Sequence, residues 1–290
     1  MNRMLLFFFI LLNFIMTSCA QNISKKDFLI TIKTEYGDMV AILYDETPKH
    51  KKNFIKLAQD HFFDSTLFHR VIEGFMIQGG DPDSKNAKPG QRLGNGGPGY
   101  NVDAEFNPKF FHEKGALSAA RLGDQMNPTK ASSGSQFYIV QGSKVSKEEL
   151  TTDVNKLNQG IGQLIQLPSY TYLQDTLKNL YYGGDLEAYK KKIFELAPLV
   201  EKELGLEIKI DISEEKVNAY ANVGGAPHLD GAYTVFGKVI QGFDVLDKIA
   251  AQPKDGADRP LKDISMTITV EEMSKKKIEK LYHYQYPDAK

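Results

Sequence analysis

The chain has 290 residues, of which 41% are hydrophobic and 25% are charged. This composition excludes a collagen, a wholly disordered chain and a protein with many membrane spans. Its formal net charge of −1 at pH 7 gives no general attraction to nucleic acid, so no nucleic-acid partner is expected. The single cysteine excludes an intramolecular disulfide and a zinc site built on several thiolates.

The first residues have the pattern of an export signal. Arg3 gives a basic start, and residues 4–16 form an apolar run interrupted only by Asn13. As a helix this run would be about 20 Å long, which is shorter than the roughly 30 Å hydrocarbon core of a bilayer. The pattern therefore favours a removable signal peptide over a lasting transmembrane helix.

The only cysteine follows this run directly, in the sequence Met16-Thr17-Ser18-Cys19. This sequence resembles a bacterial lipobox, although Met16 is a less usual residue at its position. The resemblance implies cleavage before Cys19, diacylglycerol on its sulfur and acylation of its new amine, so that several acyl chains hold the protein on a membrane. We predict a lipoprotein signal peptide over 1–18, a tether over 19–26, and a lipid-anchored place on the bacterial cell envelope, facing the periplasm or the exterior. The alternative is an ordinary signal peptide with a chance cysteine.

The next segments have the pattern of a β protein. Alternating apolar residues over 28–44 predict a hairpin with its turn at Gly37-Asp38. Thr47-Pro48 then opens a helix whose apolar face is Phe54, Leu57 and Ala58. Loops rich in glycine and proline separate further short predicted strands at 67–72, 75–78, 116–119, 136–140, 234–239 and 264–270. Many short strands with one early helix indicate a closed or nearly closed antiparallel β structure.

Between residues 143 and 226 the pattern becomes helical. Ser146 begins a capping box, and a helix-like run over 170–182 ends at two glycines. A longer, bent helix is predicted over 185–204, and another starts after Ser213. The aromatic residues of this segment favour a small core of its own, with a ligand surface as the alternative. A basic and aromatic run over 274–284 predicts a terminal helix.

Five segments carry the strongest signal, in the chain order FHRVIEGFMIQGGD, GNGGPGY, GALSAAR, GSQFYI and HLDGAYTVFGKV. Together they resemble the cyclophilin family of peptidyl-prolyl cis–trans isomerases. Each segment alone is a weak signal, but five in the family's order over about 28–142 and 227–272 are highly specific. The resemblance implies a mainly β fold with some α, namely an eight-stranded antiparallel closed barrel with capping helices, interrupted by the helical segment.

The predicted organisation follows from this resemblance. A cyclophilin-like domain covers 27–142 and 227–272, a helical insertion covers 143–226, and a C-terminal tail covers 273–290. The family's core covers neither the insertion nor the tail. Because the insertion leaves and rejoins the chain beside expected site residues, it is predicted to shape access for protein substrates or to bind protein partners.

Prolyl isomerisation makes modest chemical demands. Its barrier of about 18–20 kcal/mol comes from amide resonance, and twisting the bond localises a lone pair on the proline nitrogen. A ten-thousand-fold acceleration needs about 5.5 kcal/mol of extra transition-state binding. The reaction requires a dry pocket for the proline ring, a donor aimed at the nitrogen and a grip on the flanking backbone. It needs no nucleophile, metal or cofactor, and none is predicted.

The resemblance implies a role for each site residue. Arg70, a permanently charged donor, stabilises the twisted amide, and Gln78 holds a substrate carbonyl. Phe75, Met76, Tyr138 and Leu229 form the proline pocket, and Gln136 supports it from beside. Ala120 and Arg121 bind the residue before proline, largely through backbone. The implied substrates are proline-containing peptides and unfolded exported proteins.

Three positions depart from the family's usual residues. His228 stands where a tryptophan or another aromatic residue is common, Tyr233 stands where a histidine is common, and Tyr138 adds a hydroxyl where phenylalanine is usual. Arg70 and Gln78 keep the family's pattern, so activity is expected. The departures leave open the peptide preference and the sensitivity to the cyclic-peptide inhibitor cyclosporin.

Each signal also has a plainer interpretation. Arg70 could be a surface salt-bridge partner, and Phe75 and Met76 could be ordinary core. The glycines of 94–99 suggest a phosphate loop but lack its lysine-containing ending. Two sets of residues are candidates for other chemistry: a metal site of His61, His69, His112 and His228, which lack tight spacing, and acid–base groups Asp81, Asp83 and Glu105, which are expected to be structural. At the level of the protein, the alternatives are a proline-peptide binding module with negligible turnover and a structural lipoprotein whose insertion is the working part.

Overall fold

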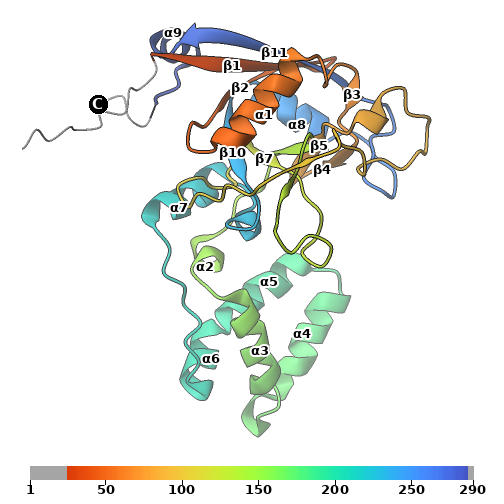
Figure 1. Ribbon diagram of the computed structural model, residues 1–290. Coiled ribbons are helices and arrows are strands. Elements are labelled where there is room, and N and C mark those ends of the chain that lie inside the picture. Colours follow the sequence, from red (N-terminus) through yellow and green to blue (C-terminus); the bar gives the residue numbers. More distant parts are fainter. Residues whose placement is uncertain (1–24, 287–290) are drawn as a thin grey trace, which may run out of the picture.

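A curled antiparallel sheet of nine strands forms the body of the protein (Figure 1). The computed structural model describes residues 25–286, so the predicted signal peptide, Cys19 and most of the predicted tether lie outside the described residues. The strands are β1 Lys26–Thr34, β2 Gly37–Leu43, β3 Thr66–Leu67, β4 Arg70–Ile72, β5 Met76–Gly79, β7 Ala116–Ala119, β9 Phe137–Val140, β10 Val235–Gln241 and β11 Ser265–Ser274. Their order is β3-β11-β1-β2-β10-β7-β9-β5-β4.

The two edge strands of this sheet are consecutive in the chain. Only Phe68 and His69 separate β3 from β4, so the sheet curls until its two edges adjoin. Within residues 25–286 no strand pairing joins β3 to β4, because strands of two and three residues at this corner pair with other neighbours. The predicted closed eight-stranded barrel is therefore not confirmed in that form, and the structure is a strongly curled half-barrel.

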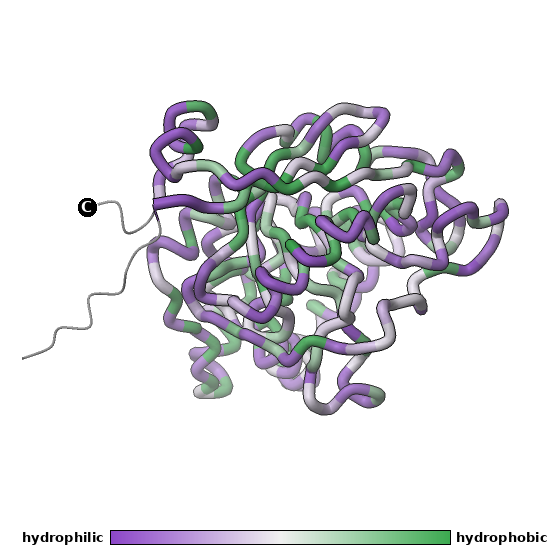
Figure 2. Tube along the Cα trace, turned by 45° about the horizontal axis from the view of Figure 1, so that its top comes forward, coloured by the Kyte–Doolittle hydropathy of each residue, from purple (hydrophilic) through white to green (hydrophobic). Residues whose placement is uncertain are grey.

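Strand alternation divides the sheet into two faces. Val71, Ile77, Leu117, Phe137 and Ile139 point into the main hydrophobic core inside the curl. Helices α1 (Pro48–Gln59) and α8 (Phe243–Ala250) also pack buried residues against this core. Hydrophobic segments accordingly gather in the interior of the body, with polar segments around them (Figure 2). Side chains on the opposite face of these strands, such as Met76 and Tyr138, lie outside this main core in a second apolar cluster.

The early local predictions are confirmed with small shifts. Helix α1 has Thr47 at its N-cap and Pro48 in its first turn, and it buries Phe54, Leu57 and Ala58 as expected. The first hairpin turns at residues 35–36, two positions before the predicted turn, because Gly37 already pairs with Thr34 across the ladder. Helix α8 was not predicted from the sequence.

Helices fill the chain between β9 and β10, mostly at one end of the molecule (Figure 1). They are α2 Lys147–Leu150, α3 Val154–Leu164, α4 Tyr172–Tyr182, α5 Leu186–Glu195, α6 Ala197–Leu204 and α7 Glu214–Asn218, with a π-helical turn at Ala219–Val223. The capping box at Ser146 and the helix ending at Gly183 are confirmed. The predicted long helix is two helices, because the chain breaks at Leu196 just before Pro198.

This helical segment has its own small core, which is aliphatic rather than aromatic. Its buried members are Leu157, Ile161, Leu164, Leu173, Leu177, Ile193, Leu196, Val200 and Ile208. Tyr170, Tyr189 and Phe194 pack at its edge, whereas Tyr181 and Tyr182 are 53% and 82% exposed. The expectation that the aromatic residues form the core is therefore correct only for part of the set.

The two ends of the helical segment meet closely at a pair of glycines. The backbone N–H of Gly225 donates to the carbonyl of Ser143 over 3.0 Å. A Cβ on Gly142, which has φ +65°, would lie 2.3 Å from the Cα of Gly225. Only glycine permits this approach, and it fixes the place where the helical segment joins the sheet.

The remaining elements complete the body. A two-stranded sheet pairs β6 (Asn101–Val102) with β8 (Ser132–Ser133), and short 3₁₀ turns lie at 82–84, 168–170 and 227–229. The predicted terminal helix is α9 (Lys275–Tyr282), which buries Ile278 against β1 and β2 residues. None of the helices within residues 25–286 is long and apolar enough to cross a membrane.

Candidate active site

The outer face of the sheet places three predicted site residues in one cross-strand row. Arg70 on β4 lies opposite Gln78 on β5, and Gln78 lies opposite Tyr138 on β9. Since alternate residues of a strand share a face, Met76 points the same way as Gln78. The residues between them, Val71 and Ile77, point into the main core. The same alternation that fills the core therefore builds the site.

Hydrogen bonds connect the polar members of the site. Arg70 Nη1 donates to Gln78 Oε1 over 3.4 Å, and Gln78 Nε2 donates to Gln136 Oε1 over 3.1 Å. Gln136 Nε2 then donates to the carbonyl of Gly96 over 2.8 Å. On its other side Arg70 Nε lies 3.6 Å from Asp258, and 40% of the arginine side chain is exposed. The guanidinium is thus held in place at the surface, where a bound peptide can reach it.

An apolar cluster adjoins this polar row. Met76, Ala120, Tyr138 and Leu229 are its buried members among the predicted residues, with Phe75 and Tyr233 packed against them. The exposed ring of His228 lies over Phe75, with a centroid distance of 5.5 Å. Partial burial lowers the pKa of His228, so its ring is neutral at pH 7.

Arg121 supports the site from behind. Its Nε donates to the carbonyl of Ala232 over 2.8 Å, and its guanidinium lies 4.4 Å from the centre of the Tyr233 ring. Its side chain is only 4% exposed. A groove of about 550 Å³ is lined by Gln78, Ala120, Arg121 and Gln136, together with glycines of the 94–99 loop. The predicted site residues are therefore all connected by contacts, and their individual roles stay predictions.

The alternative acid–base candidates have structural contacts. Asp81 accepts hydrogen bonds from the backbone N–H groups of Asp83 and Gly94. Glu105 accepts from the backbone N–H groups of Lys49 and His50 in the first turn of α1, over 3.0 Å each. Both carboxylates thus satisfy donors that have no partner in regular structure. No group of three His, Cys, Asp or Glu side chains in the described part of the chain is arranged to hold a metal ion.

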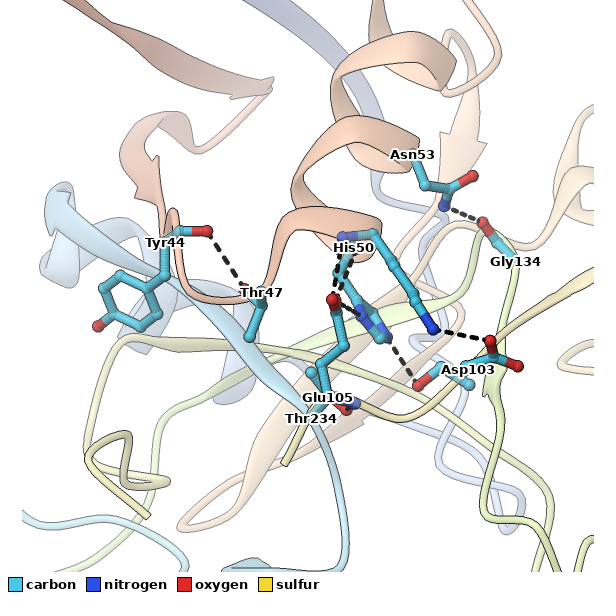
Figure 3. Close-up of polar contacts among 10 residues, drawn as sticks. Tyr44, Thr47, His50, Asn53, Asp103, Glu105, Gly134 and Thr234 are labelled. Carbon is cyan, nitrogen blue, oxygen red and sulfur yellow. Dashed lines mark hydrogen bonds and ion pairs between the residues drawn. The ribbon is translucent and has the colours of Figure 1, made fainter. Parts of the chain in front are cut away.

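His50 lies between a carboxylate and a hydroxyl, in the same order of hydrogen bonds as in a hydrolase triad. Its Nδ1 lies 2.6 Å from Glu105 Oε2, and its Nε2 lies 2.9 Å from Ser132 Oγ. Figure 3 shows His50 turned toward Glu105, with Asn53 on the same helix bonded to the carbonyl of Gly134. Ser132 is only 2% exposed, so no substrate reaches its hydroxyl. These hydrogen bonds of His50 instead connect α1 to the β6–β8 region.

Sequence reasoning missed a second buried polar group behind the apolar cluster. His112, considered only as a metal candidate, lies with its ring nitrogens 2.9 Å from Asp230 and 3.0 Å from the Tyr138 hydroxyl. Its ring is nearly parallel to that of Tyr138, at an interplanar angle of 13°. No local pattern could have paired His112 with Asp230, because 118 positions separate them.

Comparison with known proteins identifies the family. The sequence pattern described as "Cyclophilin type peptidyl-prolyl cis-trans isomerase/CLD" matches residues 29–163 and 213–271. A Staphylococcus saprophyticus protein named as a peptidyl-prolyl cis-trans isomerase is 31% identical over 248 residues, which cover 84% of this chain and 91% of that protein. A Streptococcus pyogenes protein named as a bifunctional phosphatase/peptidyl-prolyl cis-trans isomerase is 32% identical over 81% of this chain, but the match spans only 37% of that protein's length.

A crystal structure of a Cryptosporidium parvum cyclophilin type peptidyl-prolyl cis-trans isomerase has the same fold. It matches with a TM-score of 0.50 and 23% sequence identity, over 85% of this chain and 98% of that chain. The family pattern covers more than half of the chain, and the staphylococcal relative supports it over nearly the whole length. The chain therefore belongs to the cyclophilin family. It is a cyclophilin-type peptidyl-prolyl cis–trans isomerase.

Proposed function

We propose that this enzyme accelerates Xaa-Pro isomerisation in exported proteins, with Arg70 stabilising the twisted amide beside an apolar proline pocket. The observation that carries the proposal is the placement of Arg70. Its guanidinium is fixed by Gln78 and Asp258 at the border of the cluster formed by Met76 and Tyr138. A charged donor therefore borders an apolar cluster, which is the combination that the reaction requires.

The chemistry uses a difference between ground and transition states. In the planar amide the nitrogen lone pair is delocalised and accepts no hydrogen bond, whereas in the twisted amide it is localised. A donor held at that nitrogen binds the transition state more strongly than the substrate. Gln78 is placed to hold a neighbouring substrate carbonyl, and the groove at Ala120 and Arg121 is placed for the residue before proline. No covalent bond to the enzyme forms.

The test is refolding of a protein whose slow phase is limited by prolyl isomerisation, which takes tens to hundreds of seconds uncatalysed. Substoichiometric enzyme is expected to shorten this phase in proportion to enzyme concentration, without changing the fast phases. An unchanged slow phase, although the refolding protein still binds to the enzyme, would favour a binding module. Stoichiometric rather than catalytic effects would favour a structural or holding role.

The cellular location rests on the sequence before the described residues. The lipobox-like Met16-Thr17-Ser18-Cys19 supports a lipid anchor on Cys19, and the described fold begins only at Lys25. With the tether proposed over 19–26, the active site faces the periplasm or the exterior. Several acyl chains give stable attachment where a single chain gives only marginal binding.

The anchor predicts a partition experiment. The full chain expressed in bacteria is expected to enter the detergent phase of a phase-separating detergent and to incorporate labelled palmitate. Cys19→Ser should move it to the aqueous phase, or leave it as an unprocessed precursor without label. Ser18→Ala, which keeps a small residue before the cysteine, is the matched control. A labelled, detergent-soluble Cys19→Ser protein would contradict the anchor.

The helical segment supports an additional role with protein substrates. Among its elements lies a groove of about 620 Å³, lined by apolar and aromatic residues that include Ile165, Tyr181, Tyr182 and Phe194. The family pattern has no match over 164–212, so this groove is additional to the site described above. It is suited to apolar side chains of an unfolded chain.

A deletion separates this role from catalysis. Thr152 and Lys209 form a β-bridge, so residues 153–208 can be replaced by a short glycine linker without moving α2 or α7. We expect the shortened enzyme to keep its turnover of a tetrapeptide and to lose most of its advantage in protein refolding. Equal losses for both substrates would contradict a separate role.

A further inference from the structure

The buried polar group behind the apolar cluster joins four parts of the chain. Tyr138 belongs to β9, His112 precedes β7, and Asp230 lies in the turn 227–233. Tyr220 and Lys216 come from the π-helical turn and α7. Together these five residues are called the junction network, because they lie where the helical segment meets the sheet.

Asp230 is the centre of the junction network. Its carboxylate accepts from the backbone N–H of His112 over 3.0 Å and from the Tyr220 hydroxyl over 2.8 Å, and it lies 2.6 Å from Lys216 Nζ. Burial alone would raise the pKa of Asp230, but these contacts and the His112 ring outweigh it and lower the pKa. The carboxylate is therefore ionised and can only accept hydrogen bonds.

The charge of Asp230 sets the direction of the next two hydrogen bonds. His112 Nδ1 lies 2.9 Å from the carboxylate, so this nitrogen carries a proton and donates it. In the neutral ring Nε2 is then an acceptor, and the Tyr138 hydroxyl 3.0 Å away donates to it. Burial raises the pKa of Tyr138, which keeps the phenol protonated. Tyr138 thus donates to His112, and His112 donates to Asp230.

The junction network is connected to the apolar cluster at two places, Tyr138 and the turn 227–233. Tyr138 contributes its ring to that cluster, and its hydroxyl is fixed by His112. Asp230 directly follows Leu229 and precedes Tyr233 by three positions, and both of these residues belong to the same cluster. His112 is fully buried, so it touches neither solvent nor a peptide. Its contacts reach the site through Tyr138, through the backbone N–H of Ala226 and through the turn 227–233.

We propose that His112 and Asp230 are positioning residues for prolyl isomerisation, which fix Tyr138 and the turn 227–233 and thereby set the shape of the proline pocket. The proposal rests on the proposed function, since it assumes that the cluster receives proline. Tyr220 and Lys216 extend the network toward the helical segment. Residues of α7 and the π-helical turn therefore support the pocket indirectly, through their contacts with Asp230.

The distinguishing prediction is a rescue. Tyr138→Phe keeps the ring but leaves a buried imidazole nitrogen without a partner, which is more harmful than removing both partners. We expect kcat/KM for an Xaa-Pro tetrapeptide to fall about five- to tenfold, mainly through KM, because the pocket holds the ring in both ground and transition states. Adding His112→Leu, which makes both positions apolar, relieves the unpaired nitrogen but also removes the contact of His112 with Asp230, so kcat/KM should recover in part and stay below the wild type.

Two further measurements keep the outcome clear. All variants are assayed at a temperature where circular dichroism shows them folded, and peptide Kd is measured beside kcat/KM. Tyr282→Phe on α9 removes a hydroxyl far from the site and should change neither quantity. A purely structural network would lower the Tm of Tyr138→Phe and leave its kcat/KM and Kd unchanged, and that result would overturn the proposal.

A loss in Tyr138→Phe that the second change deepens rather than relieves would also overturn it. If the wild type binds peptide without accelerating isomerisation, the proposed function fails, yet the Kd values of the same variants still decide the positioning role. The two failures are therefore distinguishable.

Discussion

Replacing Arg70 with alanine is expected to lower kcat/KM for an Xaa-Pro tetrapeptide by roughly 100- to 1,000-fold, the range found when one preorganised donor to a transition state is removed. The reason is that the guanidinium is a charged donor, hydrogen-bonded to Gln78, at the border of the Met76–Tyr138 cluster. Peptide Kd should change far less, because the planar amide of the bound substrate accepts no hydrogen bond at nitrogen.

Matched variants separate charge from geometry in this experiment. Arg70→Lys keeps the positive charge but loses the planar fork that bonds Gln78, so an intermediate loss is expected. Arg92→Ala removes the same charge from an exposed loop residue and should leave kcat/KM unchanged. An Arg70→Ala enzyme with turnover within about threefold of the wild type would disprove the assigned role.

Phe137→Ala is expected to cause the largest loss of stability. Phe137 is 1% exposed and makes edge-to-face contacts with Phe54, Phe63 and Phe68. Emptying such a site reduces the free energy of unfolding by about 3–5 kcal/mol, a large share of the roughly 5–15 kcal/mol of a typical domain. Because Phe137 lies between Gln136 and Tyr138, the site should be lost with the fold.

Chemical denaturation measures this change through the midpoint and slope of the unfolding curve. Phe106→Ala is the matched control, since that ring is 40% exposed. It should shift the free energy of unfolding by no more than about 0.5 kcal/mol. A Phe137→Ala loss of similarly small size would show that the core inside the curl collapses around the missing ring.

Local signals predicted the elements that depend on neighbouring residues. The first hairpin, the start of α1 at Thr47 and the end of α4 at Gly183 follow from alternation and capping, which act over a few residues. Helices α3 and α8 were not predicted: α3 contains two glycines, which weaken a helical pattern, and α8 is only eight residues long and directly follows a strand. Their apolar residues are nevertheless buried in the two main clusters.

The site was predicted by resemblance rather than by periodicity. The row of Arg70, Gln78 and Tyr138 depends on the register between β4, β5 and β9, and β5 and β9 are far apart in the sequence. The contact of His112 with Asp230 spans 118 positions and has no local pattern. The curl of the sheet likewise arises from long-range pairing, so the resemblance implied a closed barrel where, within the described residues, no pairing joins β3 to β4.

The proposed function requires that the chain catalyses isomerisation rather than merely binding proline. The most direct measurement is two-dimensional NMR exchange on a short Xaa-Pro peptide with a catalytic amount of residues 20–290. The uncatalysed interconversion takes tens of seconds, so without enzyme no exchange cross-peaks form between cis and trans resonances at millisecond mixing times. Strong cross-peaks are expected when enzyme is added. Peptide resonances that shift or broaden on binding, without cis–trans cross-peaks, would contradict the proposed function.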